Sequence, residues 1–300
     1  IRDLVRSRGL GDVYKRQDFI HRQGTAQASR FTTAELVSIE SNLTDARSKS
    51  LNIELEIYES LVKNCLQRSE KLLSIFQGLS SLDVAIGFAE LAHKWNYSRP
   101  EISNEGIFNV VAGRHPVIEQ ILNKEKDASF ISNNCNLSDQ KIWLITGPNM
   151  AGKSTIIRQV GLIALLAQMG SFVPAKSAHI GVVDRIFTRV GASDNLVGGE
   201  STFMVEMNEA ANILNNVGNR SLILMDELGR GTSTFDGLSI AWSIVEYLHQ
   251  HERARPRTLF ATHYHEMTAL EGQLERVENF NVAVREEGDG VVFLHRLAPG

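Results

Sequence analysis

Apolar side chains recur at alternating steps of three and four residues in the first third of the chain. The repeat begins after Thr33, is interrupted by the polar Ser50, and consists of Leu36, Ile39, Leu43, Ala46, Ile53, Ile57 and Leu61. This spacing predicts a long helix with one apolar seam, as in a coiled coil, although an ordinary helix of a bundle fits the pattern equally well. A second helical stretch is expected over 72–95, and Pro100 closes the region because the residue before a proline avoids helical geometry.

After Pro100 the pattern changes to short apolar runs, each followed by polar residues and then by a helical pattern. Three of these runs are nearly all apolar, at 142–146 (IWLIT), 221–225 (SLILM) and 258–262 (TLFAT). Such runs are typical of parallel strands that are covered on both faces, and ligands bind at the carboxyl edge of such a sheet. We therefore expect an α/β domain with a mostly parallel sheet over 101–300. An all-α region is expected over 18–100.

The first of these runs leads into a glycine-rich segment, GPNMAGKST at 147–155, which matches GxxxxGK(S/T) and precedes a helical pattern that ends near Met169. In such a loop the backbone N–H groups turn toward phosphate oxygens, and the following helix presents the positive end of its dipole. The expected phosphate-binding residues are Gly147, Pro148, Asn149, Met150, Ala151, Gly152, Lys153, Ser154 and Thr155. Lys153 is expected to reach the β and γ phosphates and Ser154 to bind magnesium. A plain glycine turn is the alternative, which the strand before and the helix after disfavour.

The other two runs also end in residues that can carry chemistry. Asp226 and Glu227 follow one run, and adjacent side chains of a strand point to opposite faces, so the two carboxylates can have different roles. We expect Asp226 to hold the magnesium shell and Glu227 to orient or deprotonate the attacking water, unless the pair only caps a strand. His263 follows the other run. A neutral imidazole donates one hydrogen bond and accepts another, which suits a γ-phosphate sensor, with a structural histidine as the alternative.

Ser201 and Thr202 stand where another helix is predicted to begin, after the glycines 198 and 199. Exposed N–H groups at a helix start, together with a serine hydroxyl, can bind an anion. Capping of the helix explains a Ser-Thr pair equally well.

Composition and charge exclude several classes of protein. Lysine and arginine number 31 against 35 acidic residues, and the net charge of −4 gives no basic field over the whole chain for a nucleic-acid backbone. Cys65 and Cys135 are the only cysteines, which disfavours a disulfide framework or a zinc site. No apolar run approaches the roughly 20 residues of a membrane span, so a soluble cytoplasmic protein without a membrane partner is expected. Segment 1–17 is interpreted as non-native or disordered, with a basic arm that touches DNA as the alternative.

Four segments together resemble the MutS family of DNA mismatch-repair ATPases. They are GPNMAGKST at 147–155, STFMVEM at 201–207, DELGRGTSTFDG at 226–237 and ATHYHE at 261–266. The resemblance extends over roughly 18–300. It implies a P-loop NTPase domain of the ABC type, truncated at its carboxyl end, behind a partial helical lever.

The resemblance also implies site residues that pattern alone does not identify. Phe130 would stack on adenine, and His295 would contribute to the same base pocket. In this family ATP is hydrolysed with Mg²⁺, which makes Lys153, Glu227 and His263 the expected catalytic residues. Ser154 and Asp226 would be the metal ligands, and Ser201 would contact the ATP of the neighbouring subunit in a homodimer formed through the ATPase domains.

Family members couple ATP to the binding of mismatched double-stranded DNA and act with a MutL-like repair partner. The mismatch-reading regions would be largely missing here, and the protein would be cytoplasmic and associated with the nucleoid during repair. One alternative is a member of the same family that acts on branched recombination DNA. Another is a different ABC-type ATPase, since GGE at 198–200 echoes their glycine signature, although the STFMVEM segment argues against it. A nucleotide-binding scaffold without enzymatic activity is a third.

Overall fold

The structure is a computed structural model that describes residues 19–24, 29–125, 129–190, 202–251, 254–287 and 290–300. The chain divides into two compact units, Ile1–Leu82 and Asp83–Gly300. The predicted boundary at residue 100 therefore falls inside the second unit. The interpretation of segment 1–17 and the role expected of Ser201 lie outside the described residues.

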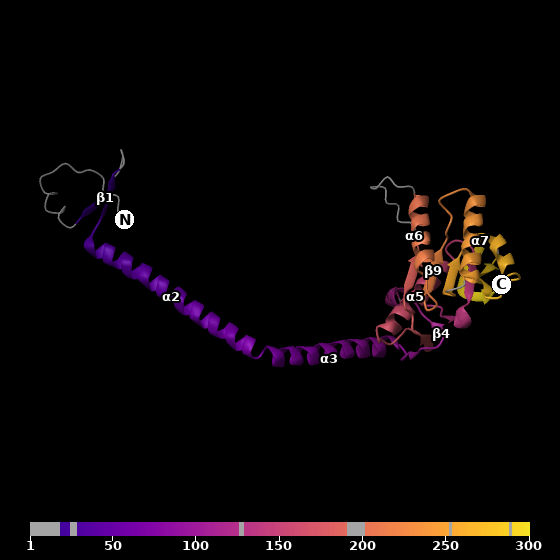
Figure 1. Ribbon diagram of the computed structural model, residues 1–300, viewed down its shortest axis with the longest axis horizontal. Helices are drawn as coiled ribbons and strands as arrows, with labels where there is room; N and C mark the ends of the chain where they lie inside the picture. The colour runs from indigo at the N-terminus through magenta and orange to yellow at the C-terminus, as the bar shows by residue number, and fades with distance from the viewer. Residues whose placement is uncertain (1–18, 25–28, 126–128, 191–201, 252–253, 288–289) are drawn as a thin grey trace. The chain divides into compact units, whose positions relative to one another are not determined.

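The first unit begins with a β-hairpin and continues as helix. Strand β1 (Ile20–Gly24) pairs antiparallel with β2 (Ser29–Thr32), so the region expected to be all-α from residue 18 starts with strands instead. Both strands are short and largely polar, so the sequence shows no alternation of hydrophobic and polar residues that would predict them. Helix α2 (Ala34–Gln67) follows as one unbroken ribbon in Figure 1 and confirms the predicted long helix. Thr33 caps it, because its hydroxyl oxygen accepts a hydrogen bond from the backbone N–H of Leu36 at 3.1 Å.

The apolar seam of α2 faces solvent within this unit. None of the side chains of α2 is buried, and Leu61, for example, is 59% exposed. Helix α3 (Ser69–Trp95) follows directly and likewise buries no side chain. An 18-residue window of this helix has a mean hydropathy of 1.5, so by length and composition the helix could cross a membrane, contrary to the expectation from the sequence. One such helix is weak evidence for a membrane span, because core helices of soluble proteins pass the same test.

The second unit is built on a six-stranded sheet in the order β12-β11-β6-β10-β9-β8. The strands are β6 (Ile142–Thr146), β8 (Ile186–Arg189), β9 (Leu222–Asp226), β10 (Arg257–Ala261), β11 (Val277–Glu287) and β12 (Gly290–Pro299). All neighbours pair parallel except β11 with β12, which pair antiparallel. The three predicted apolar runs form β6, β9 and β10, which are adjacent and buried along their whole length. The predicted α/β domain with a mostly parallel sheet is confirmed.

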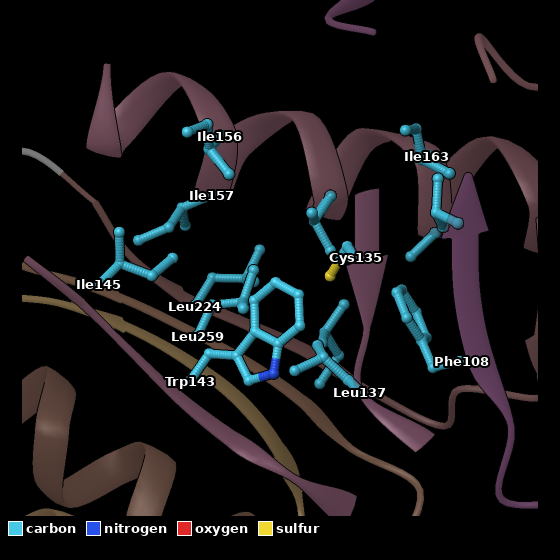
Figure 2. Packing of buried hydrophobic residues seen from close by; sticks show 14 of the residues in the cluster. Phe108, Cys135, Leu137, Trp143, Ile145, Ile156, Ile157, Ile163, Leu224 and Leu259 are labelled. Carbon is cyan, nitrogen blue, oxygen red and sulfur yellow. The ribbon is translucent and has the colours of Figure 1, made fainter. Parts of the chain in front are cut away.

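Alternate side chains of each central strand enter two different hydrophobic cores. One core lies between the sheet and helix α5 (Lys153–Gln168), where Trp143 and Ile145 of β6 pack. Figure 2 shows Ile156, Ile157 and Ile163 of α5 above Trp143, Ile145, Leu224 and Leu259 of the sheet. The other core contains Ile142 and Leu144 of β6 with helices α6 (Thr202–Asn216) and α7 (Thr234–Gln250). The sheet is therefore covered on both faces, as its apolar runs require.

A second sheet, which the sequence did not predict, packs against the same core under α5. Its order is β3-β7-β4-β5, with β3 (Glu101–Ser103), β4 (Phe108–Gly113), β5 (Asn133–Asn136) and β7 (Ser177–Gly181). Phe108 and Cys135 of this sheet lie in the core under α5 (Figure 2), and Val110 belongs to the same core. The described residues of this unit also form the short helices α4 (Pro116–Glu125), η1 (Ser138–Gln140) and η2 (His265–Leu270).

Helix α4 begins at a histidine that acts as its cap. Nδ1 of His115 accepts hydrogen bonds from the backbone N–H groups of Val117 and Ile118, both at 3.3 Å. An imidazole accepts through Nδ1 only while that nitrogen is unprotonated. Burial, together with the charge of a nearby arginine, lowers the pKa of His115 below its ordinary value, which keeps the acceptor available.

We expect this cap to make folding stability depend on pH. A histidine whose folded pKa is lowered contributes stability that is complete above about pH 6.5 and is lost as the pH falls through the folded pKa. Asparagine caps a helix without titrating, so His115→Asn should lose about 2–4 °C less in melting temperature than the unsubstituted chain between pH 7.5 and pH 5.5. Burial also lowers the pKa values of His249 and His263, so the melting temperature of both proteins should still fall to some extent as the pH falls. Melting temperatures that fall equally in the two proteins between pH 7.5 and pH 5.5 would contradict this role of His115.

Candidate functional site

The glycine-rich loop joins β6 to α5 and curls through left-handed backbone conformations. Gly147 has φ 134°, Met150 has φ 67° and Gly152, which caps α5, has φ 110°. Glycine tolerates such angles without steric cost, so residues 147 and 152 let the chain reverse tightly before the helix. The side chain of Met150 is 88% exposed and points away from the core.

The lysine of this loop folds back onto the loop itself. Nζ of Lys153 donates to the backbone carbonyls of Gly147 at 2.6 Å and Pro148 at 3.2 Å, and the residue is only 4% exposed. Burial lowers the pKa of the ammonium, while the negative charges of Glu227 and Asp226 raise it. The loop therefore encloses a desolvated positive charge beside two carboxylates.

The two carboxylates at the end of β9 have different surroundings. Asp226 is 7% exposed, and its buried Oδ1 has no hydrogen-bond partner among the described residues. Glu227 has φ 57°, an uncommon angle for a residue other than glycine, and its N–H donates to the carbonyl of Ala261 at 2.9 Å. Its Oε1 lies 4.0 Å from Nζ of Lys153 at the start of α5, so the residues that follow β9 and those that follow β6 meet although β10 lies between the two strands.

Arg230 links these groups, although the sequence analysis did not single it out. Its Nη1 lies 2.5 Å from Oε2 of Glu227, and its Nη2 donates to Oδ1 of Asn149 in the glycine-rich loop at 3.3 Å. The signal in the sequence was an arginine between two glycines, which follows the acidic pair after Leu228. Arg230 therefore connects the acidic strand end with the glycine-rich loop.

His263 lies at the end of β10, between the strands that carry the lysine and the carboxylates. Burial and then the positive charge of Arg230 lower its pKa, and Glu227 acts in the opposite direction. Its buried Nδ1 has no hydrogen-bond partner within the described parts of the chain, and its ring lies 4.1 Å from that of Tyr264. The side chain is thus a neutral imidazole with one ring nitrogen available.

The two residues expected to bind the adenine base, Phe130 and His295, lie just before β5 and in β12. Nδ1 of His295 forms a hydrogen bond with the backbone carbonyl of Ala151 at 2.8 Å, which puts this β12 residue against the glycine-rich loop. Phe130 is half-buried ahead of β5. Asn133 of β5 donates to the carbonyl of His295 at 3.0 Å, so the segment after Phe130 is held next to β12.

Metal ligands at the site are few. In the described part of the chain no group of three or more His, Cys, Asp or Glu side chains could hold a metal ion. Ser154 and Thr155 lie half-buried in the first turn of α5, and Asp226 is a carboxylate at the end of β9. Mg²⁺ keeps several waters and needs only one or two protein ligands, so this sparse set suits magnesium better than zinc or calcium.

Comparison with known proteins gives the family of the chain. A family model described as MutS domain V matches residues 143–300. The chain belongs to the MutS family. The DNA mismatch repair proteins MutS of Bartonella tribocorum, Bartonella quintana and Bartonella henselae are each 52% identical to it over 288 residues, which is 94% of this chain. The chain spans 31% of the length of these MutS relatives. The matched domain contains the glycine-rich loop, both carboxylates, His263 and His295.

Proposed function

We propose that this chain is the P-loop NTPase domain of a DNA mismatch-recognition protein, in which it binds and hydrolyses ATP with Mg²⁺ and couples nucleotide state to the binding of mismatched DNA. The observation that carries the proposal is that Lys153 and Glu227 lie 4.0 Å apart at the carboxyl edge of one mostly parallel sheet. Membership of the MutS family supports it.

The residues present fit a magnesium nucleotide. Among the described residues, the buried positive charge of Lys153 is offset by two carbonyls of the loop and by the carboxylates of Asp226 and Glu227, and an incoming triphosphate would replace the carbonyls. The buried Oδ1 of Asp226 lacks a hydrogen-bond partner among the described residues, as an oxygen reserved for a metal shell would. Asp226 and Ser154 would hold Mg²⁺, which would supply positive charge to neutralise the charge that develops on the phosphates.

Each remaining residue then has one task. Glu227 orients the attacking water and accepts its proton. His263 stays neutral because of its lowered pKa and donates a hydrogen bond toward the γ phosphate. Phe130 and His295 receive the adenine. Glycines 147 and 152 and residues 148–151 and 154–155 of the loop surround the phosphates.

The proposed function involves a second copy of the chain, DNA and a partner protein. Homodimerisation through the ATPase domains would bring Ser201 of one subunit to the nucleotide of the other. Mismatched double-stranded DNA and a MutL-like repair partner are the proposed partners, in the cytoplasm and at the nucleoid. The relatives' name, DNA mismatch repair protein MutS, favours mismatched over branched DNA.

Phosphate release by the chain in ATP and Mg²⁺ tests the proposed function. If the site is completed by a second subunit, turnover per subunit should rise with protein concentration in the micromolar range and level off when the dimer is fully formed. Sedimentation measured over the same concentrations gives the fraction of dimer. Turnover per subunit that stays constant while the protein is shown to be monomeric would contradict the shared site.

A further inference from the structure

An acidic residue lies on the buried face of α6, where the helical pattern requires an apolar one. That face is formed by Glu206, Ala210 and Ile213, which are 3%, 2% and 3% exposed. A buried carboxylate is costly unless it is paired or hydrogen-bonded, and an alkyl side chain would fill the position without that cost. Glu206 therefore breaks a local rule, and such positions concentrate at functional sites.

Glu206 holds the loop that follows β9. Its Oε1 accepts a hydrogen bond from the backbone N–H of Gly229 at 2.9 Å, in a buried setting, and lies 3.8 Å from Nη2 of Arg189. The carbonyl of Gly229 accepts a hydrogen bond from the hydroxyl of Tyr264 at 3.2 Å. Gly229 is therefore held on both its N–H and its C=O, two residues after Glu227.

A second contact joins α6 to the same loop. A Cβ atom placed on Gly231 would lie 3.0 Å from Cα of Phe203, so the loop backbone rests directly on the first turn of α6. Gly229 itself, with φ 93°, packs against the backbone of Gly237 in α7. Residues 229 and 231 are thus fixed, and Arg230 is fixed between them.

Arg230 connects the fixed backbone of residues 229 and 231 to Glu227 and to the glycine-rich loop. Its guanidinium pairs with Glu227 at 2.5 Å and bonds to Asn149 at 3.3 Å. A shift of the 229–231 backbone would move this guanidinium and with it the Glu227 carboxylate that it holds. Among the described residues Glu206 has its hydrogen bond with Gly229 and its ion pair with Arg189, and neither partner belongs to the glycine-rich loop. Its loss should therefore affect Glu227 more than the affinity for the nucleotide.

We propose that Glu206 is a positioning residue: by holding Gly229 it sets the orientation of Arg230 and Glu227, so that the placement of α6 governs the rate of ATP hydrolysis. The inference rests on the proposed ATPase function. It explains why an acidic residue is buried on α6: Glu206 controls the hydrolytic step.

The test compares Glu206→Ala, Glu206→Gln and Glu209→Gln in the same chain. Alanine removes the acceptor of the Gly229 N–H, whereas the glutamine amide keeps an oxygen at that place. Glu209 is a matched control because it lies on the same helix, is half-exposed, and pairs with the same Arg189 at 3.0 Å without touching the loop. Turnover, equilibrium ATP affinity, and hydrogen exchange of the Gly229 amide are measured for each protein.

For Glu206→Ala we expect turnover to fall about tenfold or more, ATP affinity to stay within about threefold, and the Gly229 amide to exchange about tenfold faster. Glu206→Gln should recover most of the turnover, and Glu209→Gln should match the unsubstituted chain. Gly231→Ala provides a second variant with Glu206 intact. Its added methyl presses on Phe203, so turnover should fall while ATP affinity is retained.

Three results would overturn the inference: unchanged turnover in Glu206→Ala, a loss of ATP affinity in proportion to turnover, or no recovery in Glu206→Gln. In each case an active unsubstituted chain would leave the ATPase function standing. An unsubstituted chain with no turnover would instead overturn the proposed function, and the catalytic role of Glu206 with it.

Discussion

Replacing Lys153 with alanine is expected to weaken ATP binding by about two to three orders of magnitude. The ammonium is 4% exposed and sits among backbone carbonyls, where its charge is poorly screened. Two unit charges 4 Å apart at an effective dielectric constant of about 20 attract by about 4 kcal/mol, or about three powers of ten in affinity. Part of this is lost because the ammonium must leave the carbonyls of Gly147 and Pro148. Calorimetric titration with ATP and Mg²⁺ measures the difference.

Lys176→Ala is the matched control for this experiment. Lys176 is exposed and precedes β7, so its loss removes the same charge from the chain away from the strand ends that carry the site. Its ATP affinity should equal that of the unsubstituted chain. If Lys153→Ala, with an unchanged melting temperature, also bound ATP normally, the glycine-rich loop would not be a phosphate site.

Replacing Glu227 with glutamine is expected to lower turnover by about 10²- to 10⁴-fold, the usual contribution of a general base. The amide keeps the shape of the side chain but cannot accept the proton of the attacking water. ATP affinity should be retained or raised, because a negative charge 4.0 Å from Nζ of Lys153 is removed from the site proposed to bind an anion. Phosphate release in a single turnover, with enzyme in excess, separates this chemical step from product release.

Glu275→Gln provides the control, since Glu275 is exposed and its loss changes the net charge equally. It should leave phosphate release unaltered. Unchanged turnover in Glu227→Gln would favour the alternative of a nucleotide-binding scaffold in which this carboxylate is idle.

The central sheet and the edge where the site lies could be predicted from the sequence for a physical reason. Strands covered on both faces must be apolar throughout, so β6, β9 and β10 appear as unbroken runs, and the polar residues that end them share one edge. The start of α5 followed from the glycine-rich loop. These signals are local, which is why single-sequence reasoning could find them.

The remaining features depend on contacts between distant segments. The second sheet is built from short strands such as β3 and β5, whose polar positions carry no clear alternation. The importance of Arg230 and Glu206 depends on a loop that returns to α6 and to Asn149, and no spacing in the sequence expresses that return. Phe130 and His295 were reached only through family resemblance, and their role in base binding stays a prediction.

A crystal structure of the chain with Mg²⁺ and a non-hydrolysable ATP analogue tests the central claim most directly. The account predicts that Nζ of Lys153 leaves the carbonyls of Gly147 and Pro148 to contact the β and γ phosphates, with Mg²⁺ between the phosphates and the side chains of Ser154 and Asp226. An analogue bound elsewhere, with Lys153 still bonded to those two carbonyls, would contradict it.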